Sequence, residues 1–220
     1  MSSTAETATD SAREALVARL TEVLGDAVVG SYIKPGLDVW VRVRTDAWRA
    51  AGHAVRSHLG MDYFDFLSMI DWLPSPFGKG EDDPTEPPPE RSTEVVQGYT
   101  GGDTRFQMLA RVMSSSSHLG ITLKADVPDE PFAVDSWIPV YAGANWHERE
   151  AHEMFGVSFV DHPDLRNLYL PTGFEGHPLR KDFPLLARMV KPWPGIVDVE
   201  PIPAEFDQDA AEEPAEEAST

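Results

Sequence analysis

The segment from Trp146 to Pro184 constrains the fold of this chain more than any other. Four prolines within it remove backbone donors and restrict the residue before each, so regular helix or strand is excluded over most of it. Disordered segments are poor in large apolar side chains, because burial then cannot offset chain entropy. This segment is rich in them: Phe155, Phe159, Leu165, Leu168, Tyr169, Leu170, Phe174, Leu179 and Phe183. We therefore expect an ordered but irregular chain that wraps either its own domain or a partner.

The first ten residues of the segment, Trp146 to Phe155, are the exception, because no proline interrupts them. We predict a helix here that ends at Gly156, since glycine commonly follows the last residue of a helix. Asn145 can cap its start, and Glu148, three residues later, completes a capping-box pattern.

Upstream, the periodicity of apolar residues predicts one helix followed by a hairpin. Apolar residues recur at helical spacing over residues 11–24, and a glycine follows. Residues 28–33 and the alternating run 38–44 are typical of strands, and Lys34-Pro35-Gly36 between them is typical of a turn. The two strands should therefore pair in a hairpin.

A second helix is expected after this hairpin. Thr45 or Asp46 can cap it, and the pattern continues to about Leu59. The next run, residues 62–72, is apolar and aromatic but too short for its periodicity to distinguish helix from strand.

Further strands are predicted at 93–99, 105–112 and 121–127. The last two alternate apolar and polar residues on either side of a serine-rich turn, which is typical of an antiparallel hairpin. After them, Asp135 or Ser136 can cap a short helix with a proline in or near its first turn.

Helices early in the chain, followed by strands joined through turns, indicate an α+β fold. We expect a mixed or antiparallel sheet with helices packed on it, followed by an extended, irregular C-terminal arm. The expected division of the chain is a disordered N-terminus (1–10), an α+β domain (11–145) containing an acidic, proline-rich loop (74–91), a helix with an extended docking arm (146–197), and an acidic, disordered tail (198–220).

The charge of the chain limits its partners. The formal net charge is −19, and the nine acidic residues after position 197 leave −10 on the preceding part. Both values argue against nucleic acid and against direct adsorption to an anionic membrane. The chain has no cysteine, which excludes disulfides, cysteine-ligated iron–sulfur clusters and thiol catalysis within it. No apolar run approaches the ~18–20 residues that span a bilayer, so membrane contact is expected only through another protein.

The histidines do not form a recognisable metal motif. His147 and His152 are five positions apart, which is about 140° around a helix, whereas zinc proteases use an i, i+4 pair. His162 and His177 each precede a proline in extended chain. We expect no metal ligand and no cofactor-binding residue in this chain.

Catalytic arrangements are also missing from the sequence. Glu148, Glu150 and Glu153 could supply paired carboxylates, but acid–base catalysis needs a pocket and a shifted pKa, and the sequence indicates no pocket. Neither a phosphate-binding glycine loop nor a nucleophile elbow is present. No catalytic residue is expected.

Recognition of another protein is the remaining interpretation of the segment. Basic side chains alternate with carboxylates along it, and such pairs can fix the register of a contact surface. Rigid prolines reduce the entropy lost on docking. The expected contact residues are Glu148, Arg149, Phe155, Asp164, Arg166, Arg180, Lys181 and Asp182.

Residues 148–184, which read EREAHEMFGVSFVDHPDLRNLYLPTGFEGHPLRKDFP, also carry a family resemblance. They are similar to the C subunit of the proton-pumping NADH-quinone oxidoreductase (NDH-1), respiratory complex I, whose signature has the ERE, DMFG, HPDLRR and PLRKD motifs in this order. Looser similarity extends upstream through the 113–127 hairpin. The chain departs from the signature at His152 and Glu153, where an aromatic residue and an aspartate are usual, and at Asn167, where a second arginine is usual.

The resemblance implies a non-catalytic subunit in the peripheral arm of a complex that transfers electrons from NADH through FMN and iron–sulfur clusters to quinone, coupled to proton translocation. The FMN and clusters would belong to partner subunits, so the activity would belong to the complex. The implied partners are the large D subunit of the quinone module and its iron–sulfur neighbour, the B subunit. The implied location is the cytoplasmic side of the cell membrane.

Two alternatives remain open at this point. The chain could be the equivalent subunit of a related membrane-bound hydrogenase or of another quinone-linked dehydrogenase. It could also be a free-standing metal-dependent enzyme, which the histidine spacing disfavours.

Overall fold

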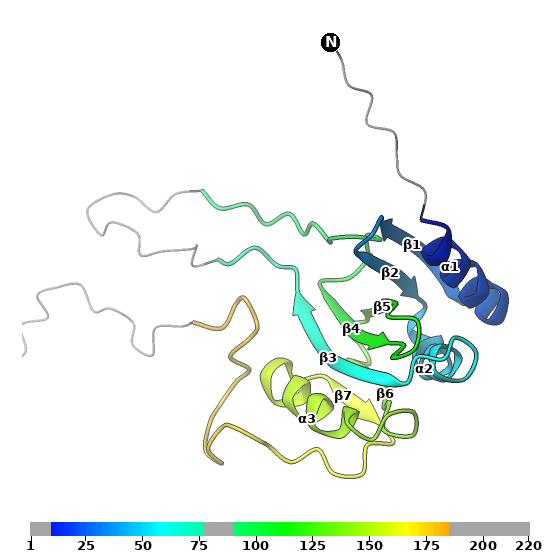
Figure 1. The fold of residues 1–220 in the computed structure, drawn as a ribbon. Helices are drawn as coiled ribbons and strands as arrows, with labels where there is room; N and C mark the ends of the chain where they lie inside the picture. Colours follow the sequence, from blue (N-terminus) through cyan, green and yellow to red (C-terminus); the bar gives the residue numbers. More distant parts are fainter. Residues whose placement is uncertain (1–9, 77–89, 185–220) are drawn as a thin grey trace, which may run out of the picture. The chain divides into compact units, whose positions relative to one another are not determined.

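A computed structural model describes residues 10–76 and 90–184 (Figure 1). Four predictions lie outside these residues: disorder at residues 1–9, most of the loop at 74–91, the docking segment at 185–197 and the acidic tail at 198–220. The described chain contains three α-helices, α1 (Ser11–Leu24), α2 (Trp48–Ser57) and α3 (Ala144–Phe155). Its strands are β1 (Val28–Lys34), β2 (Asp38–Val43), β3 (Tyr63–Asp71), β4 (Phe106–Met113), β5 (Gly120–Val127), β6 (Ala133–Asp135) and β7 (Ser158–Val160).

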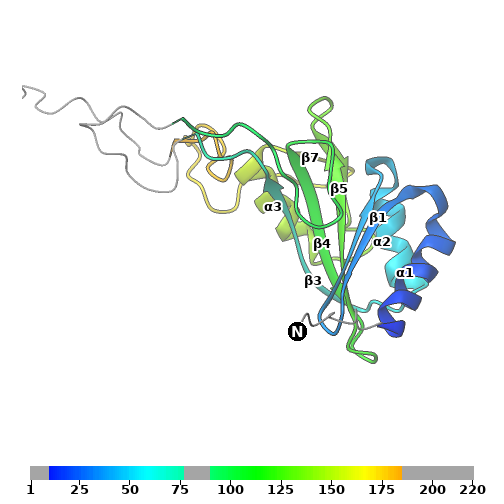
Figure 2. The same cartoon turned by 90° about the horizontal axis from the view of Figure 1, so that it is seen from above.

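Five of these strands form one mixed sheet in the order β1-β2-β5-β4-β3. Neighbouring strands are antiparallel except β2 and β5, which are parallel. β6 and β7 form a separate parallel pair. Helices pack on the large sheet (Figure 2), so the predicted α+β fold is confirmed.

The core lies on one face of the sheet. Val41, Leu123, Ala110 and Leu67 sit side by side across four strands, and none of them has exposed surface. Alternate residues of a strand share a face, so the period-two pattern of the sequence accounts for this row. The helices contribute Leu20, the Trp48 ring and other apolar residues to the same core. Burial of each large side chain stabilises the fold by about 1.5–3 kcal/mol.

Several local predictions are confirmed. The first helix ends at Leu24, and β1 and β2 form the predicted hairpin around the turn at Lys34–Gly36. β4 and β5 form the second hairpin. The ambiguous run at 62–72 contains the edge strand β3.

Other local predictions are wrong at helix starts. Thr45 begins a short 3-10 helix rather than capping α2, and the Thr45 hydroxyl donates to the Asp126 carbonyl instead. Asp135 ends strand β6, and turns follow it in place of a short helix. The N-cap of α3 is Gly143, which has no side chain, in place of the expected Asn145, and the Glu148 carboxylate binds Ser136 and Trp137. Thr45 and Glu148 thus make tertiary contacts in place of the local caps that the sequence pattern predicts.

The predicted strand at 93–99 is also wrong. This stretch has no ladder partner; it crosses the outer face of the sheet, opposite the helices. The Tyr99 ring stacks on Tyr32 with ring centroids 4.3 Å apart. Gln107 and Lys124, on polar positions of β4 and β5, are thereby buried as well.

Among the residues that the structure describes, no helix is long and apolar enough to cross a membrane.

Candidate functional site: an arm held by buried carboxylates

The segment after α3 leaves regular structure almost at once. Gly156 ends the helix in the left-handed conformation (φ 80°), and the short strand β7 pairs with β6. Residues 161–184, here called the arm, then run to Pro184 without helix or strand. The arm is drawn in yellow and orange beside α3 (Figure 1). Its backbone is fixed by hydrogen bonds to the preceding domain, so in the described residues the segment wraps its own domain.

Glu148 is buried at the centre of this region, with no exposed surface. Its carboxylate accepts hydrogen bonds from the Ser136 hydroxyl at 2.7 Å and the Trp137 backbone N–H at 2.5 Å. Burial raises the pKa of Glu148 to about 7, although these two hydrogen bonds oppose the shift. The Glu148 side chain therefore links α3 to residues 136–137, which follow β6, and fixes their position.

The His162 ring, at the start of the arm, lies beside this carboxylate. Its Nε2 is 4.0 Å from the Glu148 carboxylate and 3.3 Å from the Asn145 carbonyl. Its Nδ1 accepts the Asp164 backbone N–H at 3.0 Å, which fixes the neutral tautomer with hydrogen on Nε2. Burial lowers the pKa of His162, in agreement with a neutral ring.

A dependence of stability on pH follows from Glu148. Its pKa is raised from 4.5 in free chain to about 7 in the fold, so the folded state binds more protons between these values. Stability should therefore fall as pH rises from about 5 to 7, by roughly 2–3 kcal/mol from this group. The lowered pKa of His162 acts in the opposite direction below 6.5.

The variant Glu148→Gln isolates this contribution from that of His162. From pH 5 to pH 7 the native chain should lose stability relative to Glu148→Gln, because glutamine has no proton to release. Urea denaturation at a series of pH values measures it. A difference that stays constant with pH contradicts the inference.

Glu153, in the last turn of α3, holds the middle of the arm. Its carboxylate accepts three backbone N–H groups in a row, from Leu168 at 3.0 Å, Tyr169 at 3.0 Å and Leu170 at 2.8 Å. Burial alone would raise the pKa of Glu153, but these hydrogen bonds outweigh it and lower the pKa. A single anion thus replaces the backbone partners that an irregular chain lacks.

Asp71, the last residue of β3, holds the end of the arm. It accepts two hydrogen bonds from the Arg105 guanidinium, at 2.8 and 2.6 Å, and one from the Lys181 backbone N–H at 2.8 Å. Arg105 also pairs with Asp182 of the arm at 3.0 Å. Burial would raise the pKa of Asp71, but the hydrogen bonds from Arg105, Lys181 and Leu73 outweigh it and hold the pKa below its usual range.

Between these two carboxylates, Arg180 closes the arm over the end of α3. Its Nε donates to the Phe155 carbonyl at 2.6 Å, and its guanidinium lies over the rings of Phe106 and Phe132. His177 Nδ1 lies 2.9 Å from the Glu153 carbonyl. Both side chains approach Gly156 so closely that an added Cβ would lie 2.4 Å from the His177 ring.

The eight expected contact residues fall into three groups. Glu148 and Phe155 are buried inside the chain, so they are left out of the proposed contact set. Arg180 is half-buried and donates to α3, and Arg149 of α3 is half-buried and donates to the Arg166 and Asn167 carbonyls of the arm. The exposed group comprises Asp164, Arg166, Lys181 and Asp182, of which Asp164 and Arg166 pair at 3.1 Å.

The four histidines of the segment do not converge. His147 contacts the Phe64 ring edge-on, and His152 lies against the Val157 carbonyl; His162 and His177 have the partners given above. In the described parts of the chain, no group of three or more histidine, cysteine or acidic side chains is arranged to hold a metal ion.

Sequence reasoning missed the roles of Asp71, Arg105 and Glu153. Asp71 ends one strand and Arg105 precedes its antiparallel neighbour, where Asp71 pairs with Phe106. Recognition of 62–72 as a strand paired with 105–112 would have placed the two charges together. No sequence signal indicates that Glu153 binds backbone N–H groups.

Comparison with known proteins gives a match to a protein family and matches to individual relatives. The family described as "Respiratory-chain NADH dehydrogenase, 30 Kd subunit" matches residues 41–189. The NADH-quinone oxidoreductase C subunits of Brucella ovis and of Brucella abortus are each 46% identical over 87 residues, which is 40% of this chain and 43% of theirs. The chain thus spans less than half the length of these curated relatives in the matched region.

One solved structure supports the fold, and a second one is reported beside it. A chain of the membrane-bound sulfane sulfur reductase, described as an archaeal respiratory membrane complex, has a TM-score of 0.52 and 17% identity, over 79% of this chain and 86% of that one. A trypsin-resistant fragment of Nqo5 has a TM-score of 0.49 and 20% identity, over 70% and 99% of the two chains.

Proposed function

The chain belongs to the family of the 30 kDa subunit of the respiratory-chain NADH dehydrogenase, and on this premise we propose that it is a non-catalytic, peripheral subunit of an NADH-quinone oxidoreductase. In this proposal the complex passes electrons from NADH through FMN and iron–sulfur clusters of other subunits to quinone, coupled to proton translocation. The chain itself holds its neighbours in place. The match over residues 41–189, which includes strands β3, β4 and β5, helix α3 and the arm, carries the proposal.

The arm is the part that we propose to dock. Its inner side is fixed to the domain by Glu153, Asp71 and Arg180, while apolar side chains on it remain exposed: Tyr169 is 63% and Leu179 52% exposed. An exposed apolar residue on a backbone that is already ordered is well suited to binding, because little chain entropy is lost on docking. The proposed contact set is Asp164, Arg166, Tyr169, Phe174, Leu179, Lys181 and Asp182.

We further propose that the large D subunit of the quinone module receives the arm, with the iron–sulfur B subunit next to it. Contact with the membrane would then be indirect, on its cytoplasmic side. Residues 11–145 would form the α+β domain in this arrangement, and residues 146–197 the docking part.

The direct test is purification of the tagged chain from its host after gentle solubilisation of membranes. We expect it to recover a flavin- and iron–sulfur-containing assembly that reduces quinone with NADH. Recovery of the chain by itself under every solubilisation condition would refute the proposal. Recovery with a nickel-containing partner would favour the hydrogenase alternative.

Loss of the exposed apolar residues should weaken assembly without unfolding the chain. Truncation of a buried interface anchor costs about 2 kcal/mol or more, so Tyr169→Ser with Leu179→Ser should reduce recovery of the complex at least tenfold. The melting temperature of the isolated chain should change little, because both side chains are mostly exposed. Quantitative pull-down from membranes measures the effect.

The matched control is Tyr63→Ser with Leu37→Ser. These residues have the same side chains and similar exposure, 57% and 64%, but lie on β3 and on the β1–β2 turn. The control should leave recovery unchanged. Equal loss in both double variants would show that the arm has no special part in docking.

A further inference from the structure

Helix α3 and the first part of the arm run side by side in the same direction. At the first turn of the helix, His162 Nε2 lies 3.3 Å from the Asn145 carbonyl. In the middle, the Arg149 guanidinium donates to two carbonyls of the arm. In the last turn, Glu153 accepts the backbone N–H groups of residues 168–170. The arm therefore borders one face of α3 from its first turn to its last.

Trp146 lies on this face, at the beginning of α3. It precedes Glu153 by seven residues, which is two helical turns to within about 20°, and about 10 Å along the helix axis. All residues of α3 are described, and Trp146 is the only exposed one among them, at 68%. No other large apolar side chain of the described chain has a higher exposed fraction. The largest side chain of α3 therefore projects into solvent beside the start of the arm.

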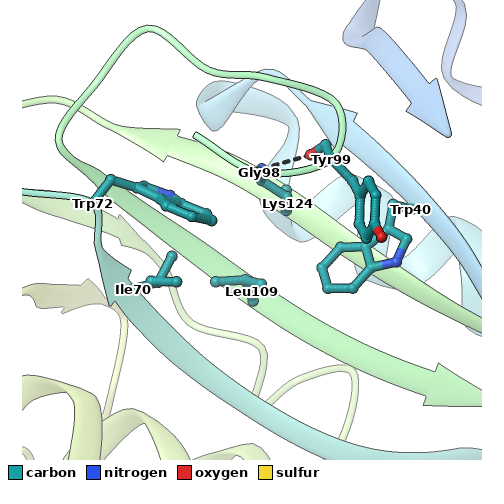
Figure 3. Close-up of a pocket in the computed structure, with 7 residues that line it drawn as sticks. All are labelled: Trp40, Ile70, Trp72, Gly98, Tyr99, Leu109 and Lys124. Carbon is teal, nitrogen blue, oxygen red and sulfur yellow. Dashed lines mark hydrogen bonds between the residues drawn. The ribbon is translucent and has the colours of Figure 1, made fainter. Parts of the chain in front are cut away.

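The other tryptophans of the described chain each pack on a neighbour inside the protein. On the outer face of the sheet, the Trp40 ring lies 5.7 Å from the Tyr99 ring, between centroids (Figure 3). On the same face, Lys124 Nζ lies 5.3 Å from the centre of the Trp72 ring. In the core, two more rings stack on each other, those of Trp48 and Trp137. Within the described residues, Trp146 has no ring or cation contact, and its indole N–H has no acceptor, so its ring is available to another protein.

The position of Trp146 gives its exposure a meaning, since single exposed apolar residues are common on protein surfaces. The arm presents Tyr169 and Leu179, and Glu153 holds Tyr169 beside the last turn of α3. Trp146 extends this apolar surface to the first turn of the helix. A span of about 10 Å fits within one contact patch, because a partner typically covers about 800 Å². The surface proposed for docking is therefore continuous with Trp146.

The charge next to Trp146 is negative. Glu150 follows Trp146 by four residues, so the two side chains are neighbours on the helix surface. The Glu150 carboxylate forms no ion pair and accepts no side-chain hydrogen bond within the described residues, whereas Asp164 and Arg166 of the arm pair with each other at 3.1 Å. An unpaired anion beside an apolar anchor is complementary to a basic residue at the rim of a partner's cleft.

We propose that Trp146 anchors the docking surface by inserting into an apolar cleft of the subunit that receives the arm, with a lysine or arginine of that subunit against Glu150. This inference rests on the proposed function and adds an anchor outside the proposed contact set. Tryptophan is enriched among the residues that dominate binding, because it supplies a large contact area at a low cost in side-chain entropy. Its N–H needs an acceptor once water is excluded, so we expect a carbonyl or carboxylate oxygen inside the cleft.

The variant Trp146→Ser tests the anchor in the complete assembly. Recovery of the other subunits with the tagged chain should fall about tenfold or more, while the melting temperature of the isolated chain should change little. The matched control is Val96→Ser, at a residue that is 66% exposed on the segment crossing the outer face. The control should leave recovery unchanged.

The possible failures of this experiment are distinguishable. If the native chain recovers no partner, the proposed function itself fails, and this inference fails with it. If the native chain and Trp146→Ser recover the complex equally well, only the assignment of Trp146 as an anchor fails. Equal loss of recovery in Trp146→Ser and Val96→Ser also overturns that assignment, because the loss would not be specific to the surface beside the arm.

The basic rim of the cleft is tested by Glu150→Lys. Recovery should fall about tenfold at low salt, because like charges would then meet across the interface, and the loss should become smaller at high salt, which screens them. Glu22→Lys on the exposed side of α1 changes the net charge equally and should not affect recovery. Equal recovery with these two variants at low salt would refute a lysine or arginine against Glu150.

Discussion

Replacement of Asp71 by asparagine should lower the free energy of unfolding by about 2–3 kcal/mol and release the end of the arm. The carboxylate has no exposed side-chain surface and accepts hydrogen bonds from Arg105, Lys181 and Leu73. Asparagine keeps the volume but loses the charge, and its NH₂ group would face other donors. Removal of one partner from a buried ion pair is costly, although Arg105 keeps its second pair, with Asp182. Arg105 is one-quarter exposed, so water limits the loss.

Urea denaturation measures this loss, and amide hydrogen exchange locates it. Exchange at Lys181 should accelerate, while exchange at Leu168 to Leu170 should not, because Glu153 still holds that part of the arm. The control is Asp46→Asn, which breaks a similar two-point contact with Arg44 at the surface, where both side chains are more than half exposed. Surface pairs contribute about 0–1 kcal/mol. Equal losses of unfolding free energy in the two variants would show that the buried Asp71 pair stabilises the fold no more than a surface pair does.

The sheet could be predicted because its sequence signal is local. The alternating residues of β2, β4 and β5 reveal their buried face directly, and the turn at Lys34–Gly36 fixes the first hairpin. The order of strands could not be predicted in the same way. The parallel contact between β2 and β5 joins residues about 80 positions apart, and no local pattern specifies that pairing.

The outer face shows a second limit of sequence reasoning. Gln107 and Lys124 alternate with core residues, so the pattern predicts that they face water. Both are buried, because residues 91–104 cross over them and provide the Tyr99 and Gly101 carbonyls as partners. The alternation of polar and apolar residues distinguishes the two faces of a strand. It does not reveal that another segment covers the polar face and accepts hydrogen bonds from its side chains.

The conformation of the arm could be predicted from the sequence, but the contacts of its residues could not. Its irregular but ordered character follows from composition, since prolines and large apolar residues occur together. The buried anions that hold it, Glu153 and Asp71, act on backbone N–H groups, and backbone groups carry no sequence signal. The sequence pattern therefore predicts partner-facing charged residues throughout the segment, although Glu148 is internal.

The second large effect is expected for Gly156→Ala, which should displace the arm between His177 and Asp182. Gly156 has φ 80°, where an L-residue costs about 1–2 kcal/mol. In addition, the new Cβ would lie 2.4 Å from His177 Nε2 and 2.8 Å from an Arg180 guanidinium nitrogen. Relief of these contacts moves both side chains and breaks the bond from Arg180 to the Phe155 carbonyl. We expect a total loss of about 2–4 kcal/mol in the free energy of unfolding.

The variant Gly60→Ala separates backbone strain from steric contact. Gly60 also has a positive φ, 69°, but an added Cβ there meets nothing within 4 Å. It should therefore show the strain alone, with normal hydrogen exchange at Leu179, whose N–H donates to the Met154 carbonyl. Gly156→Ala should accelerate exchange at Leu179 and reduce recovery of the complex. If both variants lose the same stability and Gly156→Ala assembles normally, the arm tolerates displacement, and its pre-ordering by the domain cannot be what favours docking.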